Sequence, residues 1–234
     1  MILLVLRPQV GAEATAARIR AAGHQAVTAP LFTYRALPWE APPAEAHDAV
    51  MLTSAAAARL GGEALRDLRG LPVHVVGTAT GAAARAAGFA DVAIHLGDAR
   101  TVVDALAAAG LRRVLHLGGR DHIVVAHPQM QLHRIPIYAA DAVTALPAAA
   151  ATALDRAAVA LLHSPRAART FAALLGQRDR ADIRIGCFSE AVAQAAGPGW
   201  GGVAVAEQPV DDALLAAVSR LCDQEPVCNK GPAC

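Results

Sequence analysis

Short apolar runs alternate with alanine-rich stretches along almost the whole chain. The apolar runs are typical of buried strands, and ten are predicted: 2–6, 26–29, 48–52, 73–76, 92–95, 113–117, 133–138, 158–162, 183–186 and 203–206. The alanine-rich stretches predict helices, among them 11–22, 54–60, 79–87, 101–109, 166–175, 189–196 and 210–221. Alternation of this kind, with strands apolar on both faces, indicates parallel sheets covered by helices on both sides. We expect the ten strands to form two five-stranded sheets.

Several segments of the chain occur twice, in the same order. The apolar run that ends at Ser54 returns as the run that ends at Ser164, 110 residues later. Gly77, which follows another apolar run, is matched by Gly186 after 109 residues. Matching order and spacing indicate a duplicated α/β unit. We therefore expect two similar lobes that face one another across a cleft.

Two strand-like segments that contain proline, 31–38 and 135–142, are candidates for the connection between the lobes. Proline belongs on sheet edges, so these segments are expected to pair as a short two-stranded ribbon. Two arrangements remain open: the lobes are sequential halves, or they exchange their first βαβ units. Segment 121–131 contains Pro128 and is too short for the helix predicted at its counterpart, 11–22, so it is left unassigned.

The composition excludes several classes of function. A chain of 234 residues suits two small domains, and with 3% aromatic residues and a net charge of +1 it lacks the features of a nucleic-acid binder. An anionic small molecule remains a candidate ligand. The apolar start, residues 1–6, is too short for a signal peptide, and no stretch is long enough for a membrane helix. The expected location is cytoplasmic, without membrane contact.

No metal site is predicted. The cysteines are too widely spaced for a zinc pair, and three of them lie in or near a tail, 223–234, that lacks apolar periodicity and is expected to be flexible. The cysteines are Cys187, Cys222, Cys228 and Cys234. The histidines show neither metal-ligand spacing nor the order of a Ser-His-Asp triad, which favours neutral, hydrogen-bonded side chains.

Hydroxyl-bearing residues lie where predicted strands end and helices begin: Thr53, Ser54, Thr78, Thr80, Ser164 and Ser189. Serine and threonine are preferred helix N-caps, each worth about 1 kcal/mol, so capping is the competing interpretation at every position. Ligands of doubly wound sheets lie beyond the carboxyl ends of the strands, and free amides at helix starts bind anions. Several such ends would suit a ligand that carries many carboxylates.

These features resemble the uroporphyrinogen-III synthase family over residues 1–222. The resemblance is carried by Arg7-Pro8 after the first strand, the turns Thr53-Ser54 and Ser164-Pro165, the pattern G-x-x-T at Gly77–Thr80, its variant G-x-x-S at Gly186–Ser189, and Tyr138 in the linker. Ser189 stands where the family usually has threonine. The tail 223–234 has no counterpart in the family.

The resemblance implies an α/β fold of two flavodoxin-like lobes, each a five-stranded parallel sheet flanked by helices. It places 1–33 and 144–222 in lobe 1 and 38–135 in lobe 2. The two-stranded linker would consist of 34–37 and 136–143.

The resemblance also implies an activity. Family members close hydroxymethylbilane, a linear tetrapyrrole, to uroporphyrinogen III with inversion of ring D and loss of water, a lyase reaction of haem biosynthesis. No cofactor or metal is implied, and we expect a monomer that does not bind nucleic acid. Tyr138 is the candidate catalytic residue, as a general acid that assists departure of the hydroxyl, because a phenol keeps its proton at neutral pH. The candidate substrate-binding residues are Arg7, Thr53, Ser54, Gly77, Thr80, Ser164, Gly186 and Ser189.

Two alternatives remain open. Tyr138 is equally suited to pack against a lobe as a linker side chain. The chain as a whole also fits a non-catalytic two-lobed binding protein for anionic small molecules or tetrapyrroles, an inactive paralogue, which the altered segment 121–131 favours.

Overall fold

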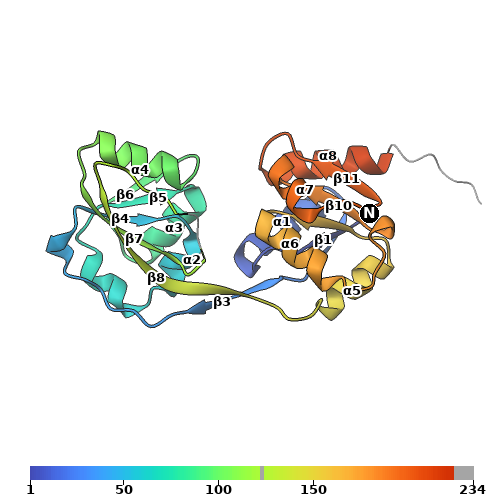
Figure 1. Cartoon of the computed structure of the whole chain (residues 1–234), viewed down its shortest axis with the longest axis horizontal. Helices are drawn as coiled ribbons and strands as arrows, with labels where there is room; N and C mark the ends of the chain where they lie inside the picture. The colour runs from blue at the N-terminus through green and yellow to red at the C-terminus, as the bar shows by residue number, and fades with distance from the viewer. Residues whose placement is uncertain (122–123, 224–234) are drawn as a thin grey trace, which may run out of the picture. The chain divides into compact units, whose positions relative to one another are not determined.

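The chain forms two compact units. A computed structural model describes residues 1–121 and 124–223 (Figure 1). Unit 1 consists of Met1–Thr33 and Ala142–Cys234, and unit 2 of Tyr34–Asp141. The units are therefore not sequential halves of the chain, because unit 1 takes both its first and its last elements. Most of the predicted tail, 224–234, lies outside the described residues.

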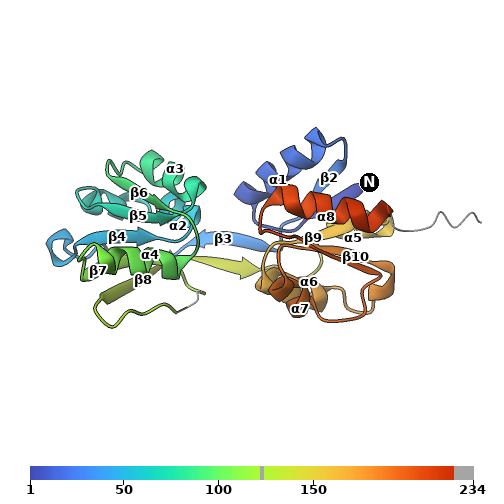
Figure 2. The same ribbon diagram turned by 90° about the horizontal axis from the view of Figure 1, so that it is seen from above.

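Unit 1 is built on a parallel five-stranded sheet with the order β11-β10-β9-β1-β2. Its strands are β1 Ile2–Val5, β2 Gln25–Thr28, β9 Val159–Leu162, β10 Arg184–Cys187 and β11 Gly202–Val205. Its helices are α1 Gln9–Ala21, α5 Ala148–Asp155, α6 Pro165–Leu174, α7 Glu190–Ala196 and α8 Asp211–Asp223, with a 3-10 turn, η3, at Arg180–Asp182. Helices α1 and α8 pack on one face of the sheet, and α6 and α7 lie on the other (Figure 2). This confirms the predicted sheet with helices on both sides.

Unit 2 contains a six-stranded sheet with the order β3-β8-β7-β4-β5-β6, in which β8, β7, β4, β5 and β6 are parallel. Its strands are β3 Phe32–Ala36, β4 Ala49–Leu52, β5 Val73–Val76, β6 Val92–His95, β7 Arg113–Gly119 and β8 Gln131–Ala142. Its helices are α2 Ala55–Leu60, α3 Thr78–Ala86 and α4 Ala99–Ala108, with 3-10 turns η1 Ala44–Ala46 and η2 Glu63–Leu68.

The expectation of five strands in this second sheet is wrong. The predicted pairing of 31–38 with 135–142 is confirmed, because β3 pairs with β8, but the ribbon is not separate, since β8 runs on from the sheet through Ala142 without a break. The ribbon and the sheet therefore share one strand. Proline causes no interruption because Pro136 is an exposed residue of β8, near the irregularity in its pairing with β7.

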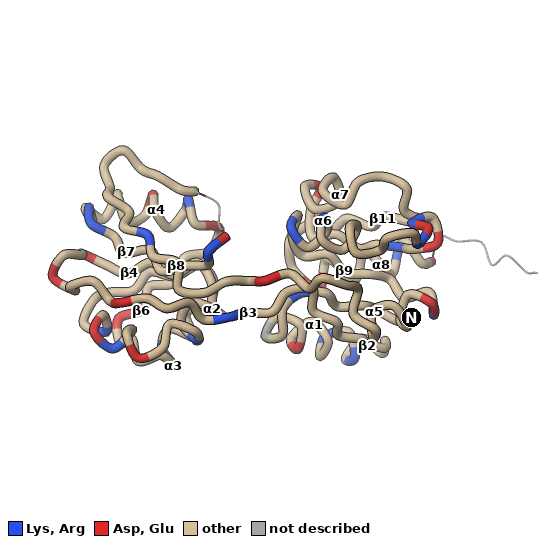
Figure 3. Tube along the Cα trace, turned by 60° about the horizontal axis from the view of Figure 1, so that its bottom comes forward, with Lys and Arg blue, Asp and Glu red and all other residues tan. Residues whose placement is uncertain are grey.

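The core of unit 2 shows why β4 is apolar throughout. Val50 and Leu52 of β4 point toward α2 and α3, whereas Ala49 and Met51 point toward α4. Alternate side chains of one strand thus enter two cores on opposite faces of the sheet. Charged residues lie mainly on helices, loops and strand ends (Figure 3).

The two sheets have the same layout when β7, β8, β4, β5 and β6 are matched with β1, β2, β9, β10 and β11. This is the correspondence that the sequence repeat predicts. In each sheet, two neighbouring strands are followed along the chain by strands on opposite sides of them. These strands are β1 and β9 in unit 1, and β7 and β4 in unit 2. Ligands of such folds bind at the carboxyl ends of these strands.

The segment between β7 and β8 has no helix among its described residues, 120–121 and 124–130. Val125 and Met130 instead pack against the core beneath α4. A loop therefore covers the position that α1 occupies in unit 1. Across residues 1–121 and 124–223, no helix combines the length and the apolar character that a membrane crossing requires.

Candidate functional site

Most of the predicted binding residues lie at the carboxyl ends of the strands in their own unit. Arg7 and Ser164 lie just beyond β1 and β9 in unit 1, and Thr53 and Ser54 directly follow β4 in unit 2. Each pair of residues thus lies at the neighbouring strands from which the chain continues in opposite directions, β1 and β9 in unit 1 and β7 and β4 in unit 2. Gly77 and Ser189 follow β5 and β10, one strand further along the respective sheet.

The serines differ in how their hydroxyls are used. Ser54 accepts a hydrogen bond from the Ala56 amide at 3.2 Å, and Ser164 accepts one from the Ala167 amide, also at 3.2 Å. Ser189 occupies the same position before α7, but its side chain makes no capping hydrogen bond. Ser54 and Ser164 are therefore N-caps, whereas the Ser189 hydroxyl is available to a ligand.

This difference predicts opposite outcomes for two matched substitutions. Ser164→Ala is expected to lower the free energy of unfolding by about 1 kcal/mol, because α6 loses its cap. Ser189→Ala is expected to leave stability nearly unchanged, because its hydroxyl makes no capping hydrogen bond. Chemical denaturation of both variants tests the pair; equal losses of stability would contradict the assignment.

Three of the predicted binding residues have clear structural roles. Gly77 has a φ of 76°, a conformation that favours glycine, at the start of α3. Thr80 is only 5% exposed within α3. Gly186 lies in β10 beneath α8, where an added Cβ would lie 2.5 Å from Cγ2 of Val218. Thr80 and Gly186 thus serve packing in this structure, and Gly77 shapes the turn.

A polar cluster lies at the carboxyl ends of β1 and β9 in unit 1, and it is centred on Asp211. His163 Nε2 lies 3.2 Å from the Asp211 carboxylate, and Thr15 donates a hydrogen bond to that carboxylate at 2.8 Å. Arg7 forms an ion pair with it at 3.6 Å. Arg7, the predicted binding residue, is therefore already paired with an acid. The Asp211 side chain is 10% exposed and that of His163 only 6%.

Burial sets the protonation of this cluster. It raises the pKa of Asp211, but the hydrogen bonds from His163 and Thr15 outweigh burial, so the pKa lies below its ordinary value. Burial lowers the pKa of His163, although Asp211 opposes the shift. The favoured state at neutral pH is a carboxylate beside a neutral imidazole.

Tyr138 lies in a second cluster, in unit 2. Its ring packs edge-on against Tyr34, with 5.5 Å between the ring centroids. An added Cβ on Gly119 would lie 2.9 Å from Cζ of Tyr138, so the ring rests on the bare backbone where β7 ends. The register of β7 against β8 shifts between Gly118 and Gly119, next to this contact. The tyrosine thus packs within unit 2, beside the carboxyl end of β7.

Thr53 belongs to the same end of the sheet. Its hydroxyl lies 3.3 Å from Nε2 of His116, a buried residue of β7. Two side-chain nitrogens lie close to Gly118. A Cβ added to Gly118 would lie 3.3 Å from Nε2 of His116 and 3.6 Å from Nη2 of Arg134. The structure therefore brings Thr53, His116 and Arg134 together around the Gly118-Gly119 backbone that supports Tyr138.

The histidines pair with one another, which the sequence did not indicate. His74 and His95 are stacked, with Nδ1 of the first 3.0 Å from Nε2 of the second. His47 and His133 form a similar stacked pair, also with 3.0 Å between nitrogens. Burial, and then the charge of His95, lower the pKa of His74, with a smaller opposing effect of Asp91.

The lowered pKa values of His74 and His163 predict a protein that is destabilised by mild acid. Each imidazole binds a proton more tightly in the unfolded chain, so stability is present above the unfolded pKa near 6.5 and is lost as the pH falls below it. Thermal unfolding at pH 7.5, 6.5 and 5.5 is expected to show a falling midpoint. His74→Gln should reduce this dependence; an unchanged slope would remove His74 from the explanation.

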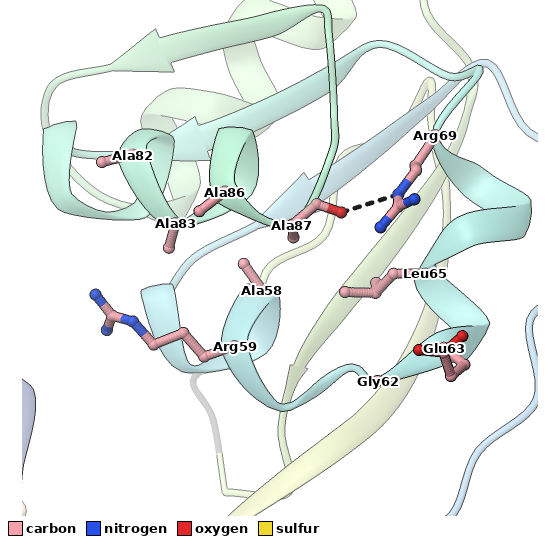
Figure 4. Close-up of a pocket in the computed structure, with 10 residues that line it drawn as sticks. All are labelled: Ala58, Arg59, Gly62, Glu63, Leu65, Arg69, Ala82, Ala83, Ala86 and Ala87. Atoms are coloured by element: carbon pink, nitrogen blue, oxygen red, sulfur yellow. Dashed lines mark hydrogen bonds between the residues drawn. The ribbon is translucent and has the colours of Figure 1, made fainter.

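One hollow of about 520 Å³ lies away from these clusters, on unit 2 between α2, η2 and α3 (Figure 4). Half of its lining residues are alanines, and Arg69 at its edge donates to the Ala87 carbonyl at 2.9 Å. The last turns of α2 and α3 form its wall, at the opposite edge of the sheet from Thr53. No convergent set of reactive groups lines it, and it is not the candidate site.

The described part of the chain has no cluster of metal-ligating side chains, and Cys187, one of its two free cysteines, is buried. No group of three or more histidine, cysteine, aspartate or glutamate side chains there is placed to hold a metal ion. Cys187 is fully buried, and burial raises its pKa to about 12, so its thiol is a poor nucleophile. Cys228 and Cys234 lie outside the described residues.

Comparison with known proteins gives one family and several similar structures. The chain matches the family model of uroporphyrinogen-III synthase HemD over residues 13–216. None of the curated proteins is significantly similar to it in sequence. Similar solved structures include a mutant uroporphyrinogen III synthase from the extremely thermophilic bacterium Thermus thermophilus, at 15% identity and a TM-score of 0.49, covering 96% of this chain and 100% of that one. Another, described as Thermus thermophilus uroporphyrinogen III synthase, has 15% identity, a TM-score of 0.41, and coverage of 94% and 99%.

Proposed function

This chain belongs to the uroporphyrinogen-III synthase HemD family, and we propose that it converts hydroxymethylbilane to uroporphyrinogen III. The observation that carries the proposal is the extent of the family match, which covers residues 13–216 and therefore elements of both units. The proposed reaction closes a linear tetrapyrrole, inverts its last pyrrole ring and releases water.

The main task of the protein in this reaction is to determine which carbon is attacked, because the substrate can lose its hydroxyl group without help. The pyrrole nitrogen of the terminal ring expels the hydroxyl group as its lone pair forms a double bond, and the product is a reactive azafulvene. Left alone, this species closes to the I isomer. The protein has to direct attack to the substituted carbon of ring D, through a spiro intermediate, by holding the chain in one conformation. Few reactive side chains are needed for this.

Tyr138 is proposed to act as the general acid that protonates the departing hydroxyl. Its position supports the proposal, because it lies beside the carboxyl end of β7, where a doubly wound sheet binds ligands. The ring of Tyr138 is held in place by its contacts with Tyr34 and with the Gly119 backbone. Tyr138 is only half-buried, so solvent still reaches it. The protonated phenol supplies the hydrogen that leaves with the hydroxyl as water, and the phenolate then takes up the proton that the tetrapyrrole releases as its rings regain aromaticity.

The acetate and propionate groups of the substrate are proposed to bind at the strand ends of each unit. The candidates are Arg7, Thr53, Ser54, Gly77, Thr80, Ser164, Gly186 and Ser189. The free Ser189 hydroxyl gives the most direct support, whereas Ser54 and Ser164 would act through the helix starts that they cap. Amides at the start of α6 and α3 are suitable donors to carboxylates. Thr80 and Gly186 would contribute by shaping the backbone around them.

The deciding experiment supplies freshly prepared hydroxymethylbilane and separates the I and III isomers of the product by chromatography. The III isomer is expected to dominate with the protein present and the I isomer without it. Formation of the I isomer alone, at the uncatalysed rate, would refute the proposed function.

A further inference from the structure

Arg134 of β8 is a half-buried cation that lacks an acid. Its Nε is buried and has no hydrogen-bond partner in the described structure. Its Nη2 donates to the carbonyl oxygen of Gly119. No carboxylate among residues 1–121 and 124–223 forms an ion pair with it. A guanidinium removed from water in this way is stabilised by an anion, and the described residues supply none.

Two arginines of the same unit, Arg35 in β3 and Arg120 just after β7, are paired with acids, so the lack of an acid at Arg134 is specific. Arg120 lies 2.8 Å from Asp141 and 3.7 Å from Asp121, and Arg35 lies 3.1 Å from Asp141. The acids near the end of β8 are thus already matched with cations. Burial lowers the pKa of the Arg134 guanidinium, and Tyr138 only partly offsets this effect.

The surroundings of Arg134 suit a carboxylate. Nη2 lies against the glycine pair at the end of β7, where the absence of side chains leaves the backbone bare. The Thr53 hydroxyl reaches the same place through its contact with His116. The guanidinium is also close enough to Tyr138 for the two side chains to interact electrostatically. A planar guanidinium binds a carboxylate through two parallel hydrogen bonds, which fixes orientation as well as position.

We propose that Arg134 binds one acetate or propionate carboxylate of the tetrapyrrole and so places the ring that bears it beside Tyr138. This inference rests on the proposed function, since it takes the ligand to be the polycarboxylate substrate. It explains why an unpaired arginine is kept in a strand next to the candidate acid. Arg134 would be a specificity-determining residue, because the ring that it holds determines which carbon is attacked.

The test compares Arg134→Gln, which removes the charge, with Arg134→Lys, which keeps it. Arg85→Gln is the matched control, because it makes the same change in the last turn of α3, at the opposite edge of the same sheet. Affinity is measured by fluorescence titration with uroporphyrin III, the stable oxidised product with eight carboxylates. The Michaelis constant for hydroxymethylbilane and the ratio of I to III isomers are measured in parallel.

Arg134→Gln is expected to weaken porphyrin binding and raise the Michaelis constant about 10- to 100-fold, and to increase the share of the I isomer. Arg134→Lys should fall between Arg134→Gln and the wild type, and Arg85→Gln should match the wild type. The salt dependence of porphyrin affinity should become shallower in Arg134→Gln. Its thermal midpoint should be no lower than that of the wild type, since an unpaired cation has been removed.

The outcomes separate the subsite from the function. Unchanged affinity and isomer ratio in Arg134→Gln, with a wild-type chain that makes the III isomer, would overturn the subsite and leave the function standing. If the wild-type chain makes only the I isomer, and Arg134→Gln still weakens porphyrin binding, the proposed function would be overturned and the carboxylate subsite would stand. A lower thermal midpoint with wild-type affinity would assign Arg134 a purely structural role and overturn the subsite.

Discussion

Replacing Asp211 with alanine is expected to destabilise unit 1 by about 3 kcal/mol, because the substitution leaves a buried polar cluster without its only described acid. Four groups lose a contact at once, although Arg18, which lies 3.9 Å from Asp211, keeps its ion pair with Asp212. Arg7 keeps its charge beside the sheet, Thr15 is fully buried and keeps only the Gly11 carbonyl as an acceptor, and His163 loses the carboxylate at 3.2 Å. This loss of stability lies near the lower end of the range for broken buried ion pairs, because the Arg7 side chain is 32% exposed and is partly solvated.

The effect is measured as a lower midpoint of thermal unfolding, by roughly 6–12 °C for a chain of this size. Asp212→Ala is the matched control, because Asp212 is the adjacent residue and its side chain is 76% exposed. Its pairing with Arg18 at 3.2 Å lies on the surface, so its loss should cost at most about 1 kcal/mol. Equal midpoints for the two variants would contradict the central position of Asp211.

The substitution also predicts a change in acid sensitivity. The pKa of Asp211 is lower in the folded chain than in the unfolded one, so its stabilising contribution is present above the unfolded pKa near 3.9 and disappears as the pH falls through that region. Asp211→Ala should therefore lose less stability than the wild type between pH 4.5 and 3. This difference in slope follows from the carboxylate alone.

The fold could be predicted from the sequence because its signals are local. An apolar run such as β9, with four buried residues, can only be placed inside a sheet covered on both faces. The serines before α2 and α6 were placed correctly at helix starts because capping depends on neighbours two or three residues away. The sequence repeat also predicted which strands of the two sheets correspond, because matching segments occur in the same order in both halves of the repeat.

The place of β3 in the sheet and the polar clusters could not be predicted, for a different reason. The pairing of 31–38 with 135–142 was predicted, but only as a separate ribbon; that one continuous strand, β8, joins this ribbon to the sheet depends on contacts between segments that are distant along the chain. Asp211 opens α8 and resembles an ordinary acidic residue of a first helical turn until it is seen beside His163. Arg134 lies among ordinary strand residues, and its lack of an acid is a property of the folded surroundings alone.

Tyr138→Phe is expected to slow formation of the III isomer by about 100-fold or more, the lower end of what a positioned general acid contributes. The variant keeps the ring and its edge-on contact with Tyr34, so the thermal midpoint should stay within about 1 °C of the wild type. Only the phenolic proton is lost. Without it the hydroxyl departs more slowly, and the bilane that dissociates before reacting closes to the I isomer in solution. The measurement is the initial rate of III formation together with the isomer ratio.

Tyr34→Phe is the matched control, because the chain has two tyrosines and the substitution deletes the same hydroxyl from the ring that packs against Tyr138. Its rate and isomer ratio should remain close to those of the wild type. If both variants lose activity equally, the tyrosine pair acts by holding β3 against β8. If Tyr138→Phe retains the wild-type rate, binding geometry alone accounts for catalysis, because expulsion of the hydroxyl by the pyrrole nitrogen then needs no acid from the protein.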